Sequence, residues 1–133
     1  MDEIAIAALV RDGSVLLAHR QPARRWYPDC WDLVGGHVER GESPQDAVLR
    51  ECREEVAVDV SQLRPVKVRI DDPNLRAHAF LVTGWTGEPT NAAPEEHDAL
   101  SWFSSDQIAG LRLAHPSYPS WLPRLIAGST AVP

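Results

Sequence analysis

Residues 36–58, GHVERGESPQDAVLRECREEVAV, carry the strongest helix signal in the chain. Ser43 is a suitable N-cap, Pro44 suits the first helical position because its missing N–H is not needed there, and Asp46 completes an approximate capping box. These signals predict a helix from about Pro44 to Val56. A helix advances by about 100° per residue, so one face should pack on a core because it gathers apolar residues: Val48, Leu49, Cys52 and Val56.

The neighbouring face of this helix is acidic, with Glu51, Glu54 and Glu55 at spacings of three and four residues. Side chains at these spacings are neighbours, and like charges there oppose helix formation. Arg50 can relieve Glu54, but one guanidinium cannot neutralise three carboxylates. The residues leave two interpretations open: a solvated acidic face, or a site for a hard divalent cation such as Mg²⁺ or Mn²⁺, which prefers carboxylate oxygens.

Three glycines precede the helix, and Gly35, Gly36 and Gly41 are predicted to form a short loop. Glycine allows a backbone carbonyl to turn toward a metal and backbone N–H groups to approach a phosphate. An ordinary glycine-rich turn would have the same composition.

Together these positions resemble the signature of the Nudix hydrolases. That signature reads Gly, five residues, Glu, seven residues, Arg-Glu, an apolar residue, any residue, Glu-Glu, any residue, Gly and an apolar residue. The chain departs from it only at Ala57, where the family has Gly. The matching positions of residues 36–58 are Gly36, Glu42, Arg50, Glu51, Cys52, Glu54, Glu55 and Val58.

The rest of the chain predicts strands around this helix and two shorter helices after them. The predicted strands are Ile4–Val10, Ser14–His19, a region within Val58–Ile70, Leu75–Trp85 and Leu100–Phe103, and the later helices run from Ser104 or Ser105 to about Gly110 and from Pro116 to Ala127. This order implies an α/β fold with a mixed sheet. The resemblance implies the Nudix fold, an α/β/α sandwich, as a single domain over residues 1–133.

The resemblance also implies an activity, the hydrolysis of a nucleoside diphosphate linked to another group. Glu51, Glu54 and Glu55 would then bind Mg²⁺, or Mn²⁺, together with the carbonyl of Gly36. Arg50 would hold the glutamates in place by ion pairing. Glu42 would be structural, near the helix N-terminus.

The general base is less defined, because relatives place it either on the helix or in the loop before the last strand. In that loop Glu96 is the candidate, with Glu95 second, although both could be solvated charges. His97 could act as an acid or base, or be a bystander.

Substrate contacts are expected before the glycines. Arg20 could face a phosphate or be an exposed charge, and Trp26 and Tyr27 could stack on a base or belong to the core.

Three functions stay open. The first is a MutT-type hydrolase that converts a nucleoside triphosphate, such as 8-oxo-dGTP or another modified dNTP, to monophosphate and pyrophosphate. The second is a pyrophosphatase of ADP-ribose or another nucleoside diphosphate derivative. The third is a Nudix module that binds a nucleotide without catalysis, which the intact set of helix carboxylates disfavours.

Length, net charge and hydropathy limit the kinds of partner and compartment to be expected. With 133 residues and 44% hydrophobic content, the chain suits one compact domain. Its formal charge of −6 argues against binding a nucleic-acid polymer. It has no apolar run long enough to span a membrane and an acidic N-terminus, so we expect a cytoplasmic protein. Homodimers are common in the family, but the sequence indicates no interface.

Overall fold

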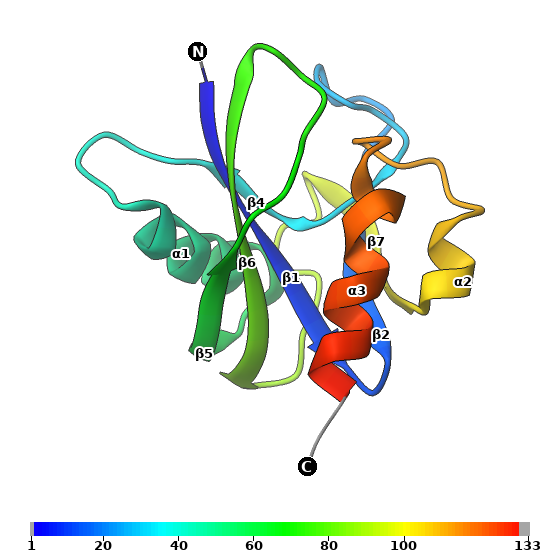
Figure 1. The fold of residues 1–133 in the computed structure, drawn as a ribbon. Helices are drawn as coiled ribbons and strands as arrows, with labels where there is room; N and C mark the ends of the chain where they lie inside the picture. The colour runs from blue at the N-terminus through cyan, green and yellow to red at the C-terminus, as the bar shows by residue number, and fades with distance from the viewer. Residues whose placement is uncertain (1, 131–133) are drawn as a thin grey trace.

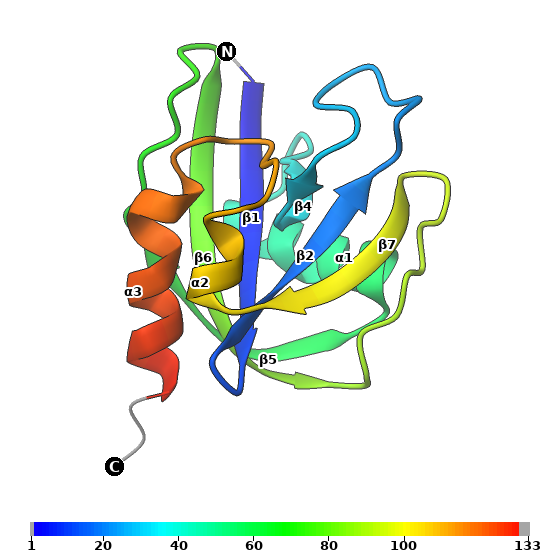
Figure 2. The ribbon, with the colours of Figure 1, turned by 90° about the vertical axis from the view of Figure 1, so that its right-hand side faces the viewer.

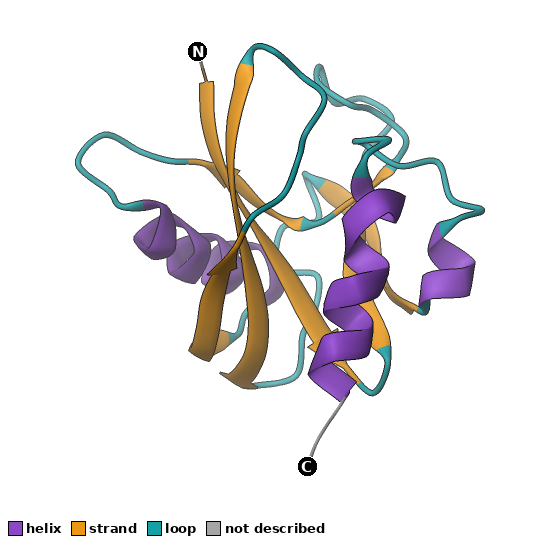
Figure 3. Cartoon of the chain, viewed as in Figure 1, coloured by secondary structure: helices purple, strands orange, loops and turns teal. Residues whose placement is uncertain are grey.

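A computed structural model describes residues 2–130 and confirms an α/β fold with a mixed sheet (Figure 1). The elements in chain order are β1 (Asp2–Arg11), β2 (Ser14–Arg20), β3 (Trp31–Asp32), β4 (Val34–His37), α1 (Pro44–Val56), β5 (Asp59–Val66), β6 (Leu75–Thr86), β7 (His97–Phe103), α2 (Ser105–Ile108) and α3 (Tyr118–Thr130). The strands lie between α1 on one side and α2 with α3 on the other (Figure 3). None of the helices in residues 2–130 is long and apolar enough to cross a membrane.

Strand β1 is the centre of the sheet. It pairs in parallel with β6 and antiparallel with β4 along its first part, and it forms the β2 hairpin at its end. Beyond β2, strand β7 runs antiparallel to it (Figure 2). The strand order is therefore β3-β2-β1-β6-β5, with β4 also paired to β1 and β7 to β2.

Two hydrophobic cores lie on opposite faces of β1, which explains why its sequence is continuously apolar. Ile6, Ala8 and Val10 belong to the core under α3. Ala5, Ala7 and Leu9 belong to the core under α1, which also takes up the apolar face of that helix: Ala47, Val48, Cys52 and Val56. A strand buried on both faces reads as an unbroken apolar run.

Helix α1 begins and ends as its local signals predict. The Ser43 hydroxyl accepts the N–H of Asp46 at 3.0 Å, and Pro44 is the first helical residue. The chain leaves the helix at Ala57, which has the left-handed φ of 59° and donates its N–H to the carbonyl of Arg53. Ala57 therefore takes the conformation that glycine adopts most easily.

The prediction that the glycines form a loop is wrong for Gly35 and Gly36. Both lie in β4, where Gly36 is paired with Ala5 and Gly35 with Ile6 of β1. A Cβ on Gly35 would lie 2.2 Å from the carbonyl oxygen of Ala5, so only glycine permits this approach. Gly35 therefore serves close strand packing rather than a turn.

Other boundaries also differ from the prediction. Strand β5 ends at Val66. The apolar residues beyond it, Val68 and Ile70, pack against the core under α3 and do not extend the sheet. Strand β7 begins at His97 instead of Leu100, since His97 pairs with Arg20 and Ala99 with His19 of β2. The last helices are α2, ending at Ile108, and α3, beginning at Tyr118.

Candidate active site

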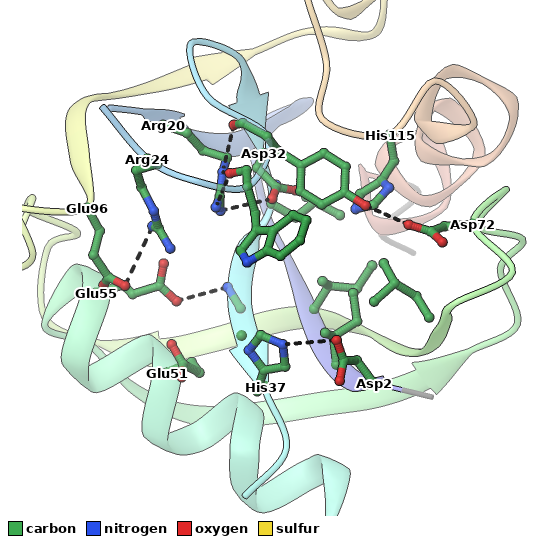
Figure 4. Close-up of a pocket in the computed structure, with 18 of the residues that line it drawn as sticks. Asp2, Arg20, Arg24, Asp32, His37, Glu51, Glu55, Asp72, Glu96 and His115 are labelled. Atoms are coloured by element: carbon green, nitrogen blue, oxygen red, sulfur yellow. Dashed lines mark hydrogen bonds and ion pairs between the residues drawn. The ribbon is translucent and has the colours of Figure 1, made fainter. Parts of the chain in front are cut away.

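A cavity of about 530 Å³ opens beside α1 and β4. Glu51, Glu55 and Glu96 line one part of it, which we call the acidic end (Figure 4). The remaining walls come from β1, from the end of β2 and the loop after it, from β3 and β4, from the segment around the start of β6, and from the segment before α3. Those walls include Arg20, Arg24, Trp26, Tyr27, Asp32, Leu33, Asp72, Asn74, Leu75 and His115.

Glu51 lies directly against the backbone of β4. A Cβ on Gly36 would be 2.7 Å from its Oε1, so the absence of a side chain at Gly36 makes room for the carboxylate. The same Oε1 lies 2.7 Å from Nη1 of Arg50. Position 36 of the signature thus needs glycine because the first carboxylate of α1 occupies that space.

Glu55 is buried at the acidic end, with an exposed fraction of only 4%. Its Oε2 accepts the N–H of Gly35 at 3.0 Å, and its Oε1 lies 2.8 Å from Nε2 of His97. Burial raises the pKa of Glu55 well above its usual range, and the neighbouring Glu51 carboxylate adds to this effect. A positive charge at this position would therefore be strongly favoured.

Glu54 takes a different position from the other two helix carboxylates. Its side chain is 58% exposed, its Oε2 lies 3.2 Å from Nη1 of Arg50, and it is not among the residues that line the cavity. The structure thus brings Glu51 and Glu55 together inside the cavity and leaves Glu54 at the surface of α1.

Arg50 connects the acidic face of α1 to Glu42 and to the backbone at the end of β4. Its Nε and Nη2 donate to the two oxygens of Glu42 at 2.8 and 3.0 Å, and Nη2 also donates to the His37 carbonyl. Its Nη1 contacts Glu51 and Glu54. The hydrogen bonds from Arg50, together with one from the backbone N–H of Glu39, lower the pKa of Glu42 to about 2. Arg50 does not line the cavity, so it supports the carboxylates without filling the space between them.

The loop before β7 supplies the third carboxylate of the acidic end. Glu96 lines the cavity, and its Oε1 lies 3.6 Å from Nη1 of Arg24. Burial raises the pKa of Glu96, while Arg24 opposes that shift. Glu95, the second choice in this loop, is not a lining residue. The oxygen or nitrogen donor atoms of Glu55, Glu96 and His97 all lie within 4.8 Å of one another and could hold a metal ion.

The sequence leaves His97 open as an acid, a base or a bystander, and it does not predict the contact of His97 with Glu55. Leu100 and Trp102 of β7 pack toward the α1 core, so strict alternation would point Asp98, not His97, toward Glu55. The pairing of β7 with β2 is irregular between His19 and Arg20, which changes that pattern. The sequence therefore held no reliable signal for this contact.

The three predicted substrate residues all line the cavity, in different ways. Arg20 donates through Nε and Nη2 to the carbonyls of Trp26 and Tyr27, and its Nη1 is 3.6 Å from Asp32. Trp26 is 63% exposed, which rules out a core role. The Tyr27 hydroxyl donates to Asp72 at 2.7 Å. Arg20 thus supports the loop that carries the two aromatic rings.

Asp32 and His115 line the cavity, although no sequence signal pointed to either of them. Asp32 accepts the hydroxyl of Tyr118 at 2.5 Å and the N–H of Leu33, and burial raises its pKa. The His115 ring lies against the rings of Tyr27 and Tyr118. These residues join the β2 loop, β3 and the start of α3 into one wall.

Comparison with known proteins agrees with this geometry. Residues 1–125 match the model of the NUDIX domain. The CTP pyrophosphohydrolase of Escherichia coli K12 is 34% identical over 134 residues, covering 96% of this chain and 90% of that protein. The MutT NUDIX hydrolase of Burkholderia pseudomallei has a TM-score of 0.73 and 30% identity, covering 98% of both chains. The E. coli ORF135 protein has a TM-score of 0.77 and 30% identity, covering 100% of this chain and 94% of that one.

Proposed function

Because the chain belongs to the NUDIX family, we propose that it hydrolyses a nucleoside triphosphate to a monophosphate and pyrophosphate. It is a Nudix pyrophosphohydrolase that acts on nucleotides; the choice of a triphosphate and the roles of its residues form the proposal. One observation carries it: a single cavity of about 530 Å³ has carboxylates at one end and the Trp26 and Tyr27 loop along another wall. Such a cavity offers a nucleotide both metal-binding oxygens and aromatic surface.

The acidic end fits a hard divalent cation. Glu51 and Glu55 are oxygen donors held close together, and burial, with the neighbouring Glu51 carboxylate, raises the pKa of Glu55. We assign Mg²⁺, or Mn²⁺, to Glu51, Glu54, Glu55 and the carbonyl of Gly36, with Glu54 joining from the helix surface. Bound there, the ion would neutralise phosphate charge and make a coordinated water more acidic.

Several side chains would support the chemistry around that ion. Arg50, anchored by Glu42, keeps Glu51 against β4. Glu96 is the proposed general base, which would accept a proton from the attacking water on a carboxylate oxygen. A pKa raised by burial suits this role, because a base works best when its pKa lies near the working pH.

The nucleoside would lie along the wall formed by the β2 loop. The exposed Trp26 ring offers a stacking surface for a base, and such contacts tolerate different bases. Arg20 would act mainly by holding the carbonyls of Trp26 and Tyr27 in place. The relative named for CTP makes cytidine triphosphate a natural first substrate to test, beside 8-oxo-dGTP.

A product analysis tests the proposal. The purified protein is incubated with Mg²⁺ and a panel of ribonucleoside and deoxyribonucleoside triphosphates, 8-oxo-dGTP and ADP-ribose, and the products are separated by ion-exchange chromatography. We expect a monophosphate and pyrophosphate from at least one triphosphate, and no product after chelation. Glu55→Gln should fold normally and lose orders of magnitude in turnover. Release of inorganic phosphate alone, or cleavage of ADP-ribose only, would contradict the triphosphate assignment.

A further inference from the structure

Two arginines line the cavity among residues 2–130, and their surroundings differ sharply. All three nitrogens of the Arg20 guanidinium are engaged by protein acceptors: Trp26, Tyr27 and Asp32. Among the described residues, the Arg24 guanidinium has one side-chain partner, the Glu96 carboxylate, and its Nη1 lies 3.6 Å from Oε1 of Glu96. Arg24 is therefore the cavity cation with unused donors.

Arg24 lies where the charge balance of the cavity is least favourable to an anion. Its side chain reaches toward Glu96 and Glu55 from the wall opposite α1 (Figure 4). The other side chains at that end are carboxylates, so a polyphosphate would meet repulsion unless cations shield it. A guanidinium suits this task, because its planar set of N–H groups matches phosphate oxygens in pairs.

We propose that Arg24 binds the phosphate chain of the substrate, exchanging its contact with Glu96 for phosphate oxygens. The contact with Glu96 is weak enough to exchange, since 3.6 Å exceeds the length of a direct hydrogen bond and the Arg24 side chain is 28% exposed. The exchange leaves the Glu96 carboxylate without its cation. Substrate binding and the release of Glu96 thereby become one event.

The neighbouring Arg25 provides a matched control within the same loop. It is exposed, its guanidinium lies 5.2 Å from the centre of the Trp26 ring, and it does not line the cavity. Arg25→Gln removes the same charge from the same loop without removing a cavity donor. General attraction of anions by the loop would be reduced equally by both substitutions.

This inference rests on the proposed function, because it presumes a polyphosphate ligand, so its test measures binding as well as turnover. Wild type, Arg24→Gln, Arg24→Lys and Arg25→Gln are titrated by calorimetry with inorganic tripolyphosphate and with an α,β-methylene nucleoside triphosphate, both in Mg²⁺. We expect Arg24→Gln to weaken binding of both probes about 10- to 100-fold, as for loss of hydrogen bonds to a charged group. Arg24→Lys should recover part of the loss, and Arg25→Gln should stay within about twofold.

A double-mutant cycle tests the exchange itself. Glu96→Gln removes the competitor of the phosphate, so it should increase affinity for the probes more when Arg24 is present than in Arg24→Gln. Equal effects in the two backgrounds would overturn the exchange. Equal losses in Arg24→Gln and Arg25→Gln, or no binding of either probe to the wild type, would overturn the phosphate contact.

The outcomes separate this inference from the proposed function. If the wild type hydrolyses a nucleotide but Arg24→Gln binds the probes as tightly as the wild type does, the proposed function stands and the role of Arg24 is rejected. If binding of the probes depends on Arg24 but no triphosphate is hydrolysed, the role of Arg24 stands and the proposed function is rejected. Circular dichroism of each variant verifies that it is folded.

Discussion

Nε2 of His97 lies 2.8 Å from Oε1 of Glu55, and both side chains are buried. Oε2 of the same carboxylate accepts the N–H of Gly35. Strands β7 and β4 therefore each hold one oxygen of Glu55, which fixes the carboxylate at the acidic end. Burial lowers the pKa of His97 to about 4, so its ring is neutral near pH 7 and carries one N–H. A carboxylate at Nε2 favours the tautomer with the proton on that nitrogen.

This relationship predicts different outcomes for two substitutions of His97. The amide nitrogen of Gln can take the place of Nε2, so His97→Gln should keep most of the turnover. His97→Leu removes the donor and should lower turnover about 10- to 100-fold while raising the Mg²⁺ concentration needed for half-maximal rate. Steady-state rates across a Mg²⁺ titration measure both effects. Equal losses in the two variants, with thermal stability unchanged, would show that the hydrogen bond does not matter.

Ala57 predicts a stabilising substitution. Its φ of 59° is left-handed, a conformation that costs a residue with a Cβ about 1–2 kcal/mol. Against this, the greater freedom of glycine in the unfolded chain lowers the free energy of unfolding by about 0.4–1 kcal/mol relative to alanine. Ala57→Gly should therefore raise the free energy of unfolding by about 0.5–1 kcal/mol. Urea denaturation followed by tryptophan fluorescence measures the change. Ala109→Gly is the control, because Ala109 ends α2 with a right-handed φ of −61° and should lose stability.

The sequence was most informative where structure is decided by near neighbours. The bounds of α1 follow from Ser43, Pro44 and the spacing of its apolar residues, and all of these act within one or two turns. The unbroken apolar run of β1, followed by Asp12-Gly13 as a tight turn, was likewise sufficient to place the hairpin. Each of these features is set by residues adjacent along the chain, so no knowledge of distant contacts was needed.

What the sequence could not give depends on contacts between distant segments. The sequence predicts a turn at Gly35 and Gly36, because the close approach of Gly35 to β1 and of Gly36 to Glu51 arises only when the strands pair. Spacing placed Glu54 with Glu51 and Glu55, but the orientation of α1 against β4 decides which carboxylates enter the cavity. Composition likewise could not tell Arg24, which lines the cavity, from an exposed loop arginine.

The two glycines of β4 predict contrasting phenotypes. A Cβ at position 36 would meet the end of the flexible Glu51 side chain at 2.7 Å, which can move. Gly36→Ala should therefore change the free energy of unfolding by less than about 1 kcal/mol, but displacing Glu51 should lower turnover about 100-fold. Gly35→Ala places its Cβ 2.2 Å from the backbone oxygen of Ala5, which cannot yield cheaply. It should cost about 3 kcal/mol or more of stability.

Urea unfolding and turnover, measured on the same preparations, check this pair. The expected pattern is a folded, slow Gly36→Ala and an unstable Gly35→Ala. Full activity in Gly36→Ala would mean that the place of Glu51 against β4 is unimportant for catalysis. A stable Gly35→Ala would mean that β4 and β1 can separate without loss.

Glu42 predicts how stability depends on acid. Hydrogen bonds, chiefly from Arg50, lower its pKa from the usual 4.5 to about 2 in the folded chain. A carboxylate whose pKa is lower in the folded state than in the unfolded state stabilises the fold fully above the unfolded pKa. That contribution is lost as the pH falls toward the folded pKa. The wild type should therefore lose stability between about pH 4.5 and pH 2 more steeply than Glu42→Gln, whose amide does not titrate.

The measurement is the difference between the two free energies of unfolding, taken by urea titration at a series of pH values. Subtracting one protein from the other removes the contributions of other titrating groups, which both share. The difference should be largest near pH 7, with the wild type more stable, and should shrink as the pH approaches 2. Because Glu42 also anchors Arg50, turnover at pH 7 should fall in Glu42→Gln. A difference in stability that stays constant with pH would mean that Arg50 does not hold the Glu42 carboxylate in solution.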